Sequence, residues 1–292
     1  MDAKKLERFR NRVTFISGSS KNAGKTTFLN YLLPRLRTGG DLVYLSVGID
    51  GEKKDRVFGN EKPAIEAVPG DYVITCEDMM NESSALFQIC HVYPWKTALG
   101  KLLLLSVKRS GLVELAGPEA NSQLMEIITH LRGERGIPTV IVDGAVNRIT
   151  QLAAGKDSSY YYVMRVTPEN RSSAITTIRV LNLLDRIPSW EERGRETAYF
   201  HQGALTSTSL KAIPKDTESL VLEDFTKVFL PWRELRELAE KVKVYFCNVF
   251  TLEGLVLNLY NLDQSEFEQN LKEAGIVVPY IFNPFLLEKR GL

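Results

Sequence analysis

The sequence predicts an α/β protein built on a mostly parallel sheet flanked by helices, with a smaller C-terminal α/β unit. Three observations near the N-terminus predict this class. Residues 13–17 have the apolar, β-rich character of a buried strand, residues 26–36 are apolar at helical spacing, and residues 41–47 form a second strand pattern. Strand, helix and strand in this order make a βαβ unit, whose two strands pair in parallel.

Similar patterns continue along the chain. Residues 138–142 are wholly apolar, as buried parallel strands are. The segment KRSG predicts a hairpin between strands at 101–107 and 112–115. The polar stretch 51–70, which contains Gly and Pro, predicts a long loop. We also expect strands at 71–75 and 160–166 and helices at 122–131 and 172–184.

The segment DRIPSWEERGRE, residues 185–196, predicts a domain boundary because it is polar and carries Pro and Gly. We place a larger domain at 1–188 and a smaller α/β domain at 189–292. A surface loop within one domain is the alternative. Beyond the segment we expect strands near 197–201, 219–222, 242–247 and 277–282, and helices at 232–241 and 264–274.

Composition and charge exclude several classes of protein. The 292 residues are 44% hydrophobic and 25% charged, with a net charge of +1, so nothing global indicates nucleic-acid binding. No apolar run approaches the roughly 20 residues needed to span a bilayer. The N-terminus lacks a signal-peptide core, and the three cysteines lack metal-type spacing. We therefore expect a cytoplasmic protein with neither a nucleic-acid nor a membrane partner.

The strongest functional pattern lies between the first strand and the first helix. Residues 18–27 read GSSKNAGKTT, which is G-x5-G-K-T, whereas the usual phosphate-binding P-loop is G-x4-G-K-[ST]. The usual spacing places the first glycine at position 19, but this chain has Ser19 there and its glycine one position earlier, at Gly18. The residues expected to bind the nucleotide are Gly18, Ser19, Ser20, Lys21, Asn22, Ala23, Gly24, Lys25, Thr26 and Thr27.

These residue types suit a polyphosphate for physical reasons. Glycines let successive backbone N–H groups turn inward and approach the phosphates closely, and the helix N-terminus adds its dipole. We expect the Lys25 ammonium between the β and γ phosphates, and the Thr26 hydroxyl on Mg²⁺. Lys21 is expected to reach a phosphate, in this chain or in a partner subunit, with simple solvent exposure as its alternative. A chance Gly-Lys-Thr-Thr at a helix start is the alternative for the whole loop.

Three acidic residues follow predicted strands, where a magnesium site needs them. Asp143 ends PTVIVD, which has the apolar-then-carboxylate form of a Walker B segment, and Asp50 follows LVYLSVGI. We expect both to hold the metal together with Thr26. A turn or helix-capping role is the alternative for Asp143, and an ordinary turn for Asp50.

Glu119 lies in LAGPEANS, between an apolar strand and a helix. We expect it to contribute to catalysis together with Lys25 and Asp50. The alternative is a purely structural segment in which Asn121 or Ser122 caps the following helix.

These motifs resemble the deviant P-loop class. G-x5-GKT is similar to dethiobiotin synthetase and the cobyrinic acid amide synthetases, and KNAGKTT resembles the KNSGKTT loop of the molybdopterin-guanine dinucleotide biosynthesis adaptor. The blocks GSSKNAGKTT, GPEANSQLMEII and VIVDGAVNR together resemble an ATP-binding protein encoded beside adenosylcobalamin-dependent lysine or ornithine aminomutases, thought to be a reactivase subunit. The resemblance covers residues 13 to about 185.

The resemblance implies a P-loop NTPase-like fold, a carboxylate at Asp50 that touches Mg²⁺ or attacking water, and a homodimer. GTPases of this class carry N-K-x-D. This chain has none, and Asn147-Arg148 is the nearest match. We therefore expect ATP with Mg²⁺ rather than GTP.

The function expected is a P-loop ATPase that acts on a partner protein, and the resemblance makes that partner an adenosylcobalamin-dependent aminomutase. One alternative is a small-molecule ligase or kinase resembling dethiobiotin synthetase, for which Lys108 and Arg109 are candidate substrate contacts. Another is a nucleotide-binding adaptor with negligible turnover.

Overall fold

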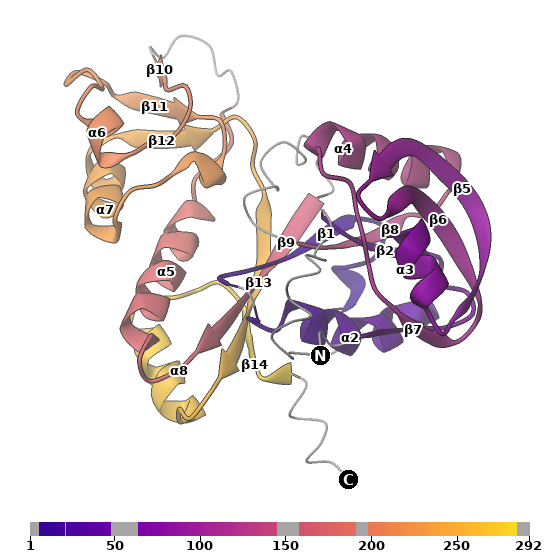
Figure 1. Cartoon of the computed structure of the whole chain (residues 1–292). Coiled ribbons are helices and arrows are strands. Elements are labelled where there is room, and N and C mark those ends of the chain that lie inside the picture. The colour runs from indigo at the N-terminus through magenta and orange to yellow at the C-terminus, as the bar shows by residue number, and fades with distance from the viewer. Residues whose placement is uncertain (1–5, 21, 48–63, 145–157, 191–197, 285–292) are drawn as a thin grey trace.

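A nine-stranded sheet organises the protein. The computed structural model describes residues 6–20, 22–47, 64–144, 158–190 and 198–284 (Figure 1). The strands lie in the order β14 (Tyr280–Phe282), β13 (Thr251–Leu259), β9 (Ser158–Val166), β1 (Val13–Gly18), β8 (Thr139–Asp143), β2 (Leu42–Ser46), β4 (Tyr72–Cys76), β6 (Gly100–Arg109) and β5 (Leu86–Thr97). Neighbours from β14 to β4 are parallel, and β6 and β5 complete the sheet antiparallel.

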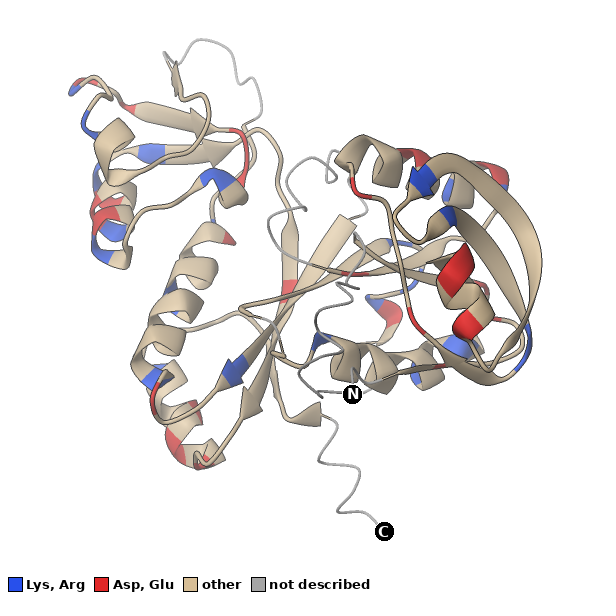
Figure 2. Ribbon diagram, viewed as in Figure 1, with Lys and Arg blue, Asp and Glu red and all other residues tan. Residues whose placement is uncertain are grey.

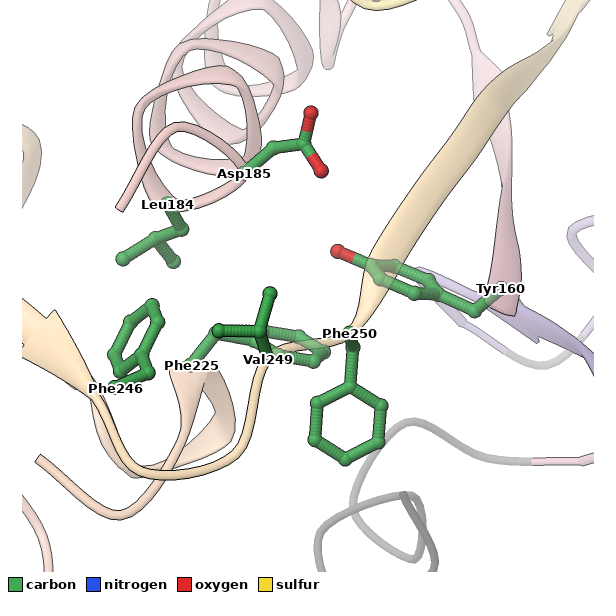
Figure 3. Close-up of a pocket in the computed structure, with 7 residues that line it drawn as sticks. All are labelled: Tyr160, Leu184, Asp185, Phe225, Phe246, Val249 and Phe250. Carbon is green, nitrogen blue, oxygen red and sulfur yellow. The ribbon is translucent and has the colours of Figure 1, made fainter. Parts of the chain in front are cut away.

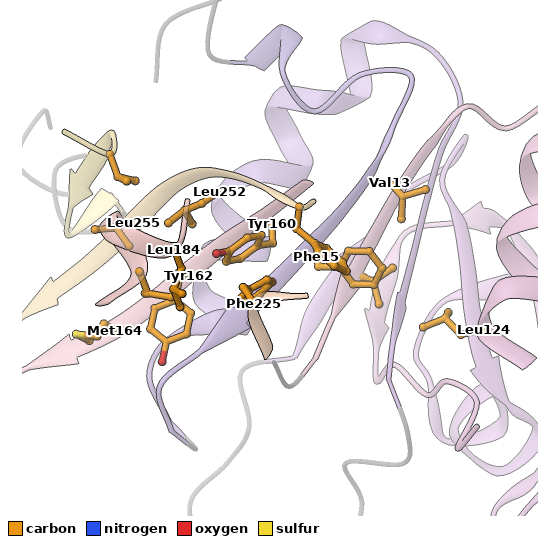
Figure 4. Close-up of a cluster of buried hydrophobic side chains, with 14 of the residues drawn as sticks. Val13, Phe15, Leu124, Tyr160, Tyr162, Met164, Leu184, Phe225, Leu252 and Leu255 are labelled. Carbon is orange, nitrogen blue, oxygen red and sulfur yellow. The ribbon is translucent and has the colours of Figure 1, made fainter. Parts of the chain in front are cut away.

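Helices cover both faces of this sheet. On one face α2 (Lys25–Leu36) buries Phe28 and Leu32 in a cluster with Ile16 of β1. On the other face a larger cluster joins Phe15 and Tyr160 to helices α4 (Asn121–Thr129), α5 (Arg171–Leu184) and α8 (Gln264–Glu273), and Figure 4 shows part of it. The expected α/β class, a mostly parallel sheet flanked by helices, is confirmed.

Charge is distributed as this layering requires. Figure 2 shows acidic and basic residues mainly on the outer helices and loops, while the central strands are largely uncharged. No helix of the described segments is long and apolar enough to cross a membrane.

The C-terminal third does not form one separate unit. Strands β10 (Ala198–Phe200), β11 (Ser219–Leu222) and β12 (Lys243–Phe246) make a small parallel sheet, accompanied by α6 (Ser207–Leu210) and α7 (Trp232–Lys241) (Figure 1). The chain then returns to the large sheet with β13, α8 and β14. The expected boundary at 188/189 therefore separates β13 and β14 from the sheet to which they belong.

Strand β13 is absent from the sequence-based prediction. Its nine residues read TLEGLVLNL, and Glu253 and Gly254 interrupt the apolar run. The pairing with β9 shifts register at this point, between Leu252 and Gly254. Glu253 contributes instead to ion pairs with Arg8 at 3.0 Å and Arg12 at 2.7 Å. Because Glu253 and Gly254 interrupt the apolar residues of β13, the sequence pattern did not indicate a strand there.

The hairpin expected around KRSG is wrong. Strand β6 already has β4 on one edge and β5 on the other, so it has no free edge for the following strand. Its hairpin partner is the preceding β5, which was not predicted. The following strand, β7 (Gly111–Val113), pairs instead with β3 (Ile65–Ala67), which lies inside the stretch expected to be a loop. Of that stretch, residues 51–63 lie outside the described segments.

Short helical segments complete the fold. They are α3 (Glu77–Glu82), a π-helical turn at His130–Glu134 after α4, and 3-10 turns at Arg37–Gly39 and Phe225–Lys227. The other elements expected from the sequence are present within a few residues of their predicted ends.

A buried ion pair fixes the end of α2 against the sheet. Asp71 is 2% exposed, and its Oδ2 lies 2.9 Å from Arg37 Nη2. The Tyr44 hydroxyl of β2 donates to the same carboxylate at 2.9 Å. Burial, together with the charge of Asp71, raises the pKa of Tyr44. The Asp71 carboxylate therefore accepts hydrogen bonds from Arg37, in the turn after α2, and from Tyr44, at the centre of β2.

Replacing this carboxylate removes the counter-ion of the partly buried Arg37 and the hydrogen-bond acceptor of the buried Tyr44. We expect Asp71→Ala to lower the free energy of unfolding by about 3–5 kcal/mol, because the Tyr44 hydroxyl loses its acceptor and Arg37 keeps only its bond to the Glu66 carbonyl, at 2.6 Å. Chemical denaturation measures the change. The matched control is Glu237→Ala, which breaks the exposed Arg233–Glu237 pair at 3.0 Å and should cost less than about 1 kcal/mol. Equal losses in the two variants would contradict the role given to Asp71.

Candidate functional site

The loop at residues 18–24 lies at the carboxyl edge of the parallel strands. Strand β1 ends at Gly18, beside Val163 of β9. The Ser19 amide donates to the Val163 carbonyl at 3.0 Å, and the Phe28 amide donates to the Gly24 carbonyl at 2.9 Å. These two bonds anchor the loop at its start, on the sheet, and at its end, in the first turn of α2.

Two residues of the loop have left-handed backbone conformations. Gly24 has φ +100°, and Asn22 has φ +61°, which asparagine tolerates better than most residues. A Cβ at residue 24 would also lie 2.5 Å from Asn258 Nδ2, so the backbone conformation favours glycine there and any side chain would displace the Asn258 amide. The amides of Lys25, Thr26 and Thr27 point out of the first helical turn without intrahelical acceptors. That end of α2 favours an anion.

Lys25 folds back over the loop. Its Nζ donates to the Ser20 carbonyl at 3.1 Å. The side chain passes close to Gly18, where an added Cβ would lie 3.0 Å from Lys25 Cγ. The unusual position of the first glycine therefore has a structural reason, since Gly18 leaves room for the lysine stem.

Thr26 and Asp143 meet beside the loop. The Thr26 hydroxyl donates to Asp143 Oδ2 at 3.1 Å. Asp143 ends β8, the parallel neighbour of β1, and is in register with Ile16. The Val47 amide, just past β2, donates to the Asp143 carbonyl at 2.9 Å, which fixes the strand end on its other side. A hydroxyl and a half-buried carboxylate from two different elements thus converge at one point.

These two oxygens fit a magnesium ion by their chemistry. Mg²⁺ prefers oxygen ligands and keeps several waters, so it is usually held by one or two carboxylates together with substrate phosphates. The described residues contain no group of three or more His, Cys, Asp or Glu that could hold a metal by themselves. A metal here would need ligands from a bound phosphate or from water.

The remaining expected site residues have different outcomes. Lys21 and Asp50 lie outside the described residues. Glu119 is exposed, and none of the described contacts joins it to Lys25, Thr26 or Asp143. Its segment is tied to the end of β2 by the Ser46 amide, which donates to the Ala116 carbonyl at 3.3 Å.

The cap that the alternative for this segment assigned to Asn121 or Ser122 is wrong. Helix α4 begins at Asn121, and its N-cap residue is Ala120. Asn121 and Ser122 therefore lie inside the first turn. The Ala120 amide donates instead to Gln123 Oε1 at 3.4 Å.

Asn258 is a site residue that the sequence did not reveal. It lies on β13, and its Nδ2 donates to the Ala23 carbonyl at 2.7 Å. Nearby, Arg165 of β9 is in register with Asn258, and its guanidinium carbon lies 4.4 Å from the centre of the Tyr260 ring. The available signal was the apolar run 255–257, which would have marked β13 as a strand and placed Asn258 near its carboxyl end.

Comparison with models of known protein families and with curated proteins finds no match to this chain. Function is therefore inferred from the residues and their arrangement.

The link from Asn258 to the loop can be tested directly. We expect Asn258→Leu to speed amide hydrogen exchange at residues 22–27 by about fivefold, because the lost bond is worth about 1 kcal/mol. The control is Asn182→Leu, which removes side-chain bonds to the Gly275 carbonyl at 3.4 Å and to the Val277 and Val278 amides at 3.0 and 3.3 Å, all away from the loop, and should leave exchange at residues 22–27 unchanged. Unchanged exchange in the loop of Asn258→Leu would show that Asn258 does not hold it.

Proposed function

We propose that this chain is a Mg-ATP-binding P-loop ATPase that acts on a partner protein. The single observation that carries the proposal is the 3.1 Å contact between Thr26 and Asp143, directly after the loop at residues 18–24. Chance glycines at a helix start would not place a carboxylate from the neighbouring strand against the residue after the lysine. A metal-phosphate site requires that arrangement.

The loop contributes binding and charge. The amides of the first turn of α2 donate to phosphate oxygens, and the helix dipole adds attraction. Lys25 exchanges the Ser20 carbonyl for an anionic phosphate oxygen, so its ammonium gains an oppositely charged partner in place of a neutral carbonyl. Because Lys25 is already folded over the loop, little side-chain entropy remains to be lost on binding.

The metal ligands in this proposal are Thr26 and Asp143, and Asp50 stays a proposed third member. Thr26 supplies a hydroxyl, and Asp143 supplies a carboxylate that neutralises metal charge or orients a metal-bound water. Bound ATP would supply the phosphoanhydride bond that is cleaved, and Mg²⁺ would neutralise negative charge on its phosphates. Glu119 remains a proposed catalytic group without a described contact to the loop.

ATP remains the proposed nucleotide, because the chain has no N-K-x-D sequence. Asn147-Arg148, its nearest match, lies outside the described residues. The aminomutase partner and the homodimer are proposals that rest on the resemblance of the sequence blocks.

The ligase alternative loses its candidate substrate contacts. Lys108 and Arg109 end β6, which runs antiparallel to β4. The end of β6 therefore lies at the amino edge of the parallel strands, where the Val107 amide donates to the Asp71 carbonyl at 3.0 Å. The loop at residues 18–24 is at the opposite edge.

Removing the lysine tests nucleotide binding. We expect Lys25→Ala to weaken ATP binding by about 100-fold, because a charge-assisted contact to phosphate is lost. Isothermal titration calorimetry measures the affinity, and circular dichroism verifies the fold. The control is Lys272→Ala, which removes a surface ammonium paired with Glu268 at 3.4 Å. If Lys25→Ala and the wild type bind ATP with the same affinity, the P-loop assignment is wrong.

Removing the carboxylate charge tests the metal role. We expect Asp143→Asn to lower Mg²⁺-dependent ATP turnover by about 100-fold, while ATP affinity without metal changes less than about threefold. Turnover is measured with and without the partner, over a range of Mg²⁺ concentrations. The control is Asp41→Asn, at an exposed position just before β2. Full turnover in Asp143→Asn would remove this residue from the metal site.

A further inference from the structure

Two histidines meet where β5 passes the end of α4. Four strands of the large sheet separate β5 from β1, so this region lies away from the loop at residues 18–24 (Figure 1). His91 comes from β5 and His130 directly follows α4, and both side chains are half-buried. The aromatic hollow beside Asp185 (Figure 3), by contrast, has room for only about one water molecule. Of these two places, only the histidine pair is open enough to take a ligand from solution.

The two imidazole rings are in contact, and a buried tyrosine holds one of them. Their centres lie 4.4 Å apart, with the ring planes tilted by 44°. The Tyr93 hydroxyl lies 3.0 Å from His130 Nδ1, and the Tyr93 ring meets His91 edge to face at 4.8 Å. Tyr93 is 3% exposed, and Trp95 stacks on it with ring centres 5.6 Å apart. Because Tyr93 is packed on two sides, it fixes the orientation of the His130 ring.

Three of the four ring nitrogens in this pair have no hydrogen-bond partner among the described residues. They are the two nitrogens of His91 and Nε2 of His130. Burial, together with the charge of His91, lowers the pKa of His130, which favours the neutral ring. With the proton on Nδ1, His130 donates to the Tyr93 oxygen and keeps a lone pair on Nε2. Histidines that bind a metal almost always have their other nitrogen hydrogen-bonded in this way.

The backbone at His130 is also specialised. His130 is the first residue of the π-helical turn His130–Glu134, which continues α4. Its amide donates to two carbonyls, those of Glu126 and Ile127. π-helical turns are rare, and they are found frequently at functional sites. The side chain and the backbone therefore both mark His130 as a residue placed for a specific contact.

We propose that His91 and His130 together bind a divalent transition-metal ion, each through one ring nitrogen. A metal ion about 2.0–2.1 Å from each nitrogen lies about 3.2 Å from each ring centre. Two rings at right angles about the metal then have centres about 4.5 Å apart, and two rings at a tetrahedral angle about 5.2 Å. The observed 4.4 Å fits the right angle. Square-planar and octahedral ions such as Cu²⁺ and Ni²⁺ are therefore favoured over tetrahedral Zn²⁺.

Little in the structure has to change for the ion to bind. The His91 ring turns until one nitrogen faces the same point as Nε2 of His130, and within the described segments no hydrogen bond resists that turn. The described residues contain no third His, Cys, Asp or Glu that could complete the site, so water fills the remaining positions. These positions are open to a donor atom from a substrate or a partner. The ion also joins the edge strand β5 to the end of α4, and binding therefore stabilises the folded chain.

The first test titrates the full chain with Ni²⁺ in nucleotide-free buffer. Ni²⁺ is the probe because Cu²⁺ oxidises thiols, and the chain has three cysteines. Calorimetry should show one ion per chain with a dissociation constant of about 10–100 µM, and the melting temperature should rise with Ni²⁺ concentration. Mg²⁺, which prefers oxygen ligands, should leave the histidine ring signals in NMR spectra unchanged. A Ni²⁺ dissociation constant above about 1 mM would overturn the proposal.

Removing each ring tests whether both bind the ion. His91→Gln and His130→Gln should each weaken Ni²⁺ binding about tenfold or more, because one imidazole ligand is lost. Circular dichroism verifies the fold of each variant. The control is His201→Gln, which removes the chain's remaining histidine, whose Nε2 lies 3.3 Å from the Ala204 carbonyl, and it should leave the affinity unchanged. A loss of affinity in only one of the first two variants, or an equal loss in His201→Gln, would overturn the proposal.

Tyr93→Phe tests how His130 is positioned. The variant keeps the ring that packs on His91 and Trp95 but removes the hydroxyl beside Nδ1. We expect Ni²⁺ binding to weaken about tenfold, while the melting temperature of the metal-free chain falls by at most about 4 °C. An unchanged Ni²⁺ affinity would show that Tyr93 does not orient His130, contrary to the proposal. Lys25→Ala should bind Ni²⁺ as the wild type does, so the metal site stands or falls independently of the proposed ATPase function.

Discussion

The contact between Thr26 and Asp143 depends on a feature of the whole fold, the parallel pairing of β1 and β8. Parallel neighbours end at the same edge of a sheet, so the loop after β1 and the carboxylate that ends β8 meet without further adjustment. An antiparallel β8 would carry Asp143 to the far edge. The helix that provides Thr26 is also the one whose first-turn amides have no intrahelical acceptors, so in the proposed function one connection supplies both the anion site and a metal ligand.

The C-terminal strands support the same site from the other side. Strand β13 pairs with β9 and directs Asn258 at the Ala23 carbonyl, while Gly24 leaves room for the amide. The shape of the loop is therefore set by segments more than 200 residues apart in sequence, as the separation of 235 between Asn258 and Ala23 shows. A ligand that moves the loop would act on β13 through this bond, and β13 follows directly after β12 of the small parallel sheet.

Local sequence patterns predicted those parts of the fold that are determined by residues close together in the sequence. The βαβ unit, the apolar β8 and the position of Gly24 before Lys25 all follow from short stretches of sequence. The errors arise where strand pairing depends on strands that are distant in the sequence. Strand β6, for example, is paired with β4 and β5 on its two edges and has no free edge for β7. Asn258 was missed for a related reason, because Glu253 and Gly254 break the pattern of β13 and nothing local indicates that its side chain meets the loop. The Thr26–Asp143 pair was predicted as two metal ligands, and its contact depends on strand order, which local patterns leave open.

The most direct test of the central claim is a crystal structure of the chain with Mg²⁺ and a non-hydrolysable ATP analogue. The account predicts phosphates against the amides of Lys25 to Thr27, with the Lys25 ammonium moved from the Ser20 carbonyl to a phosphate oxygen and the metal beside Thr26 and Asp143. An analogue bound elsewhere, with Lys25 still on Ser20 and no density at the loop under saturating conditions, would contradict it.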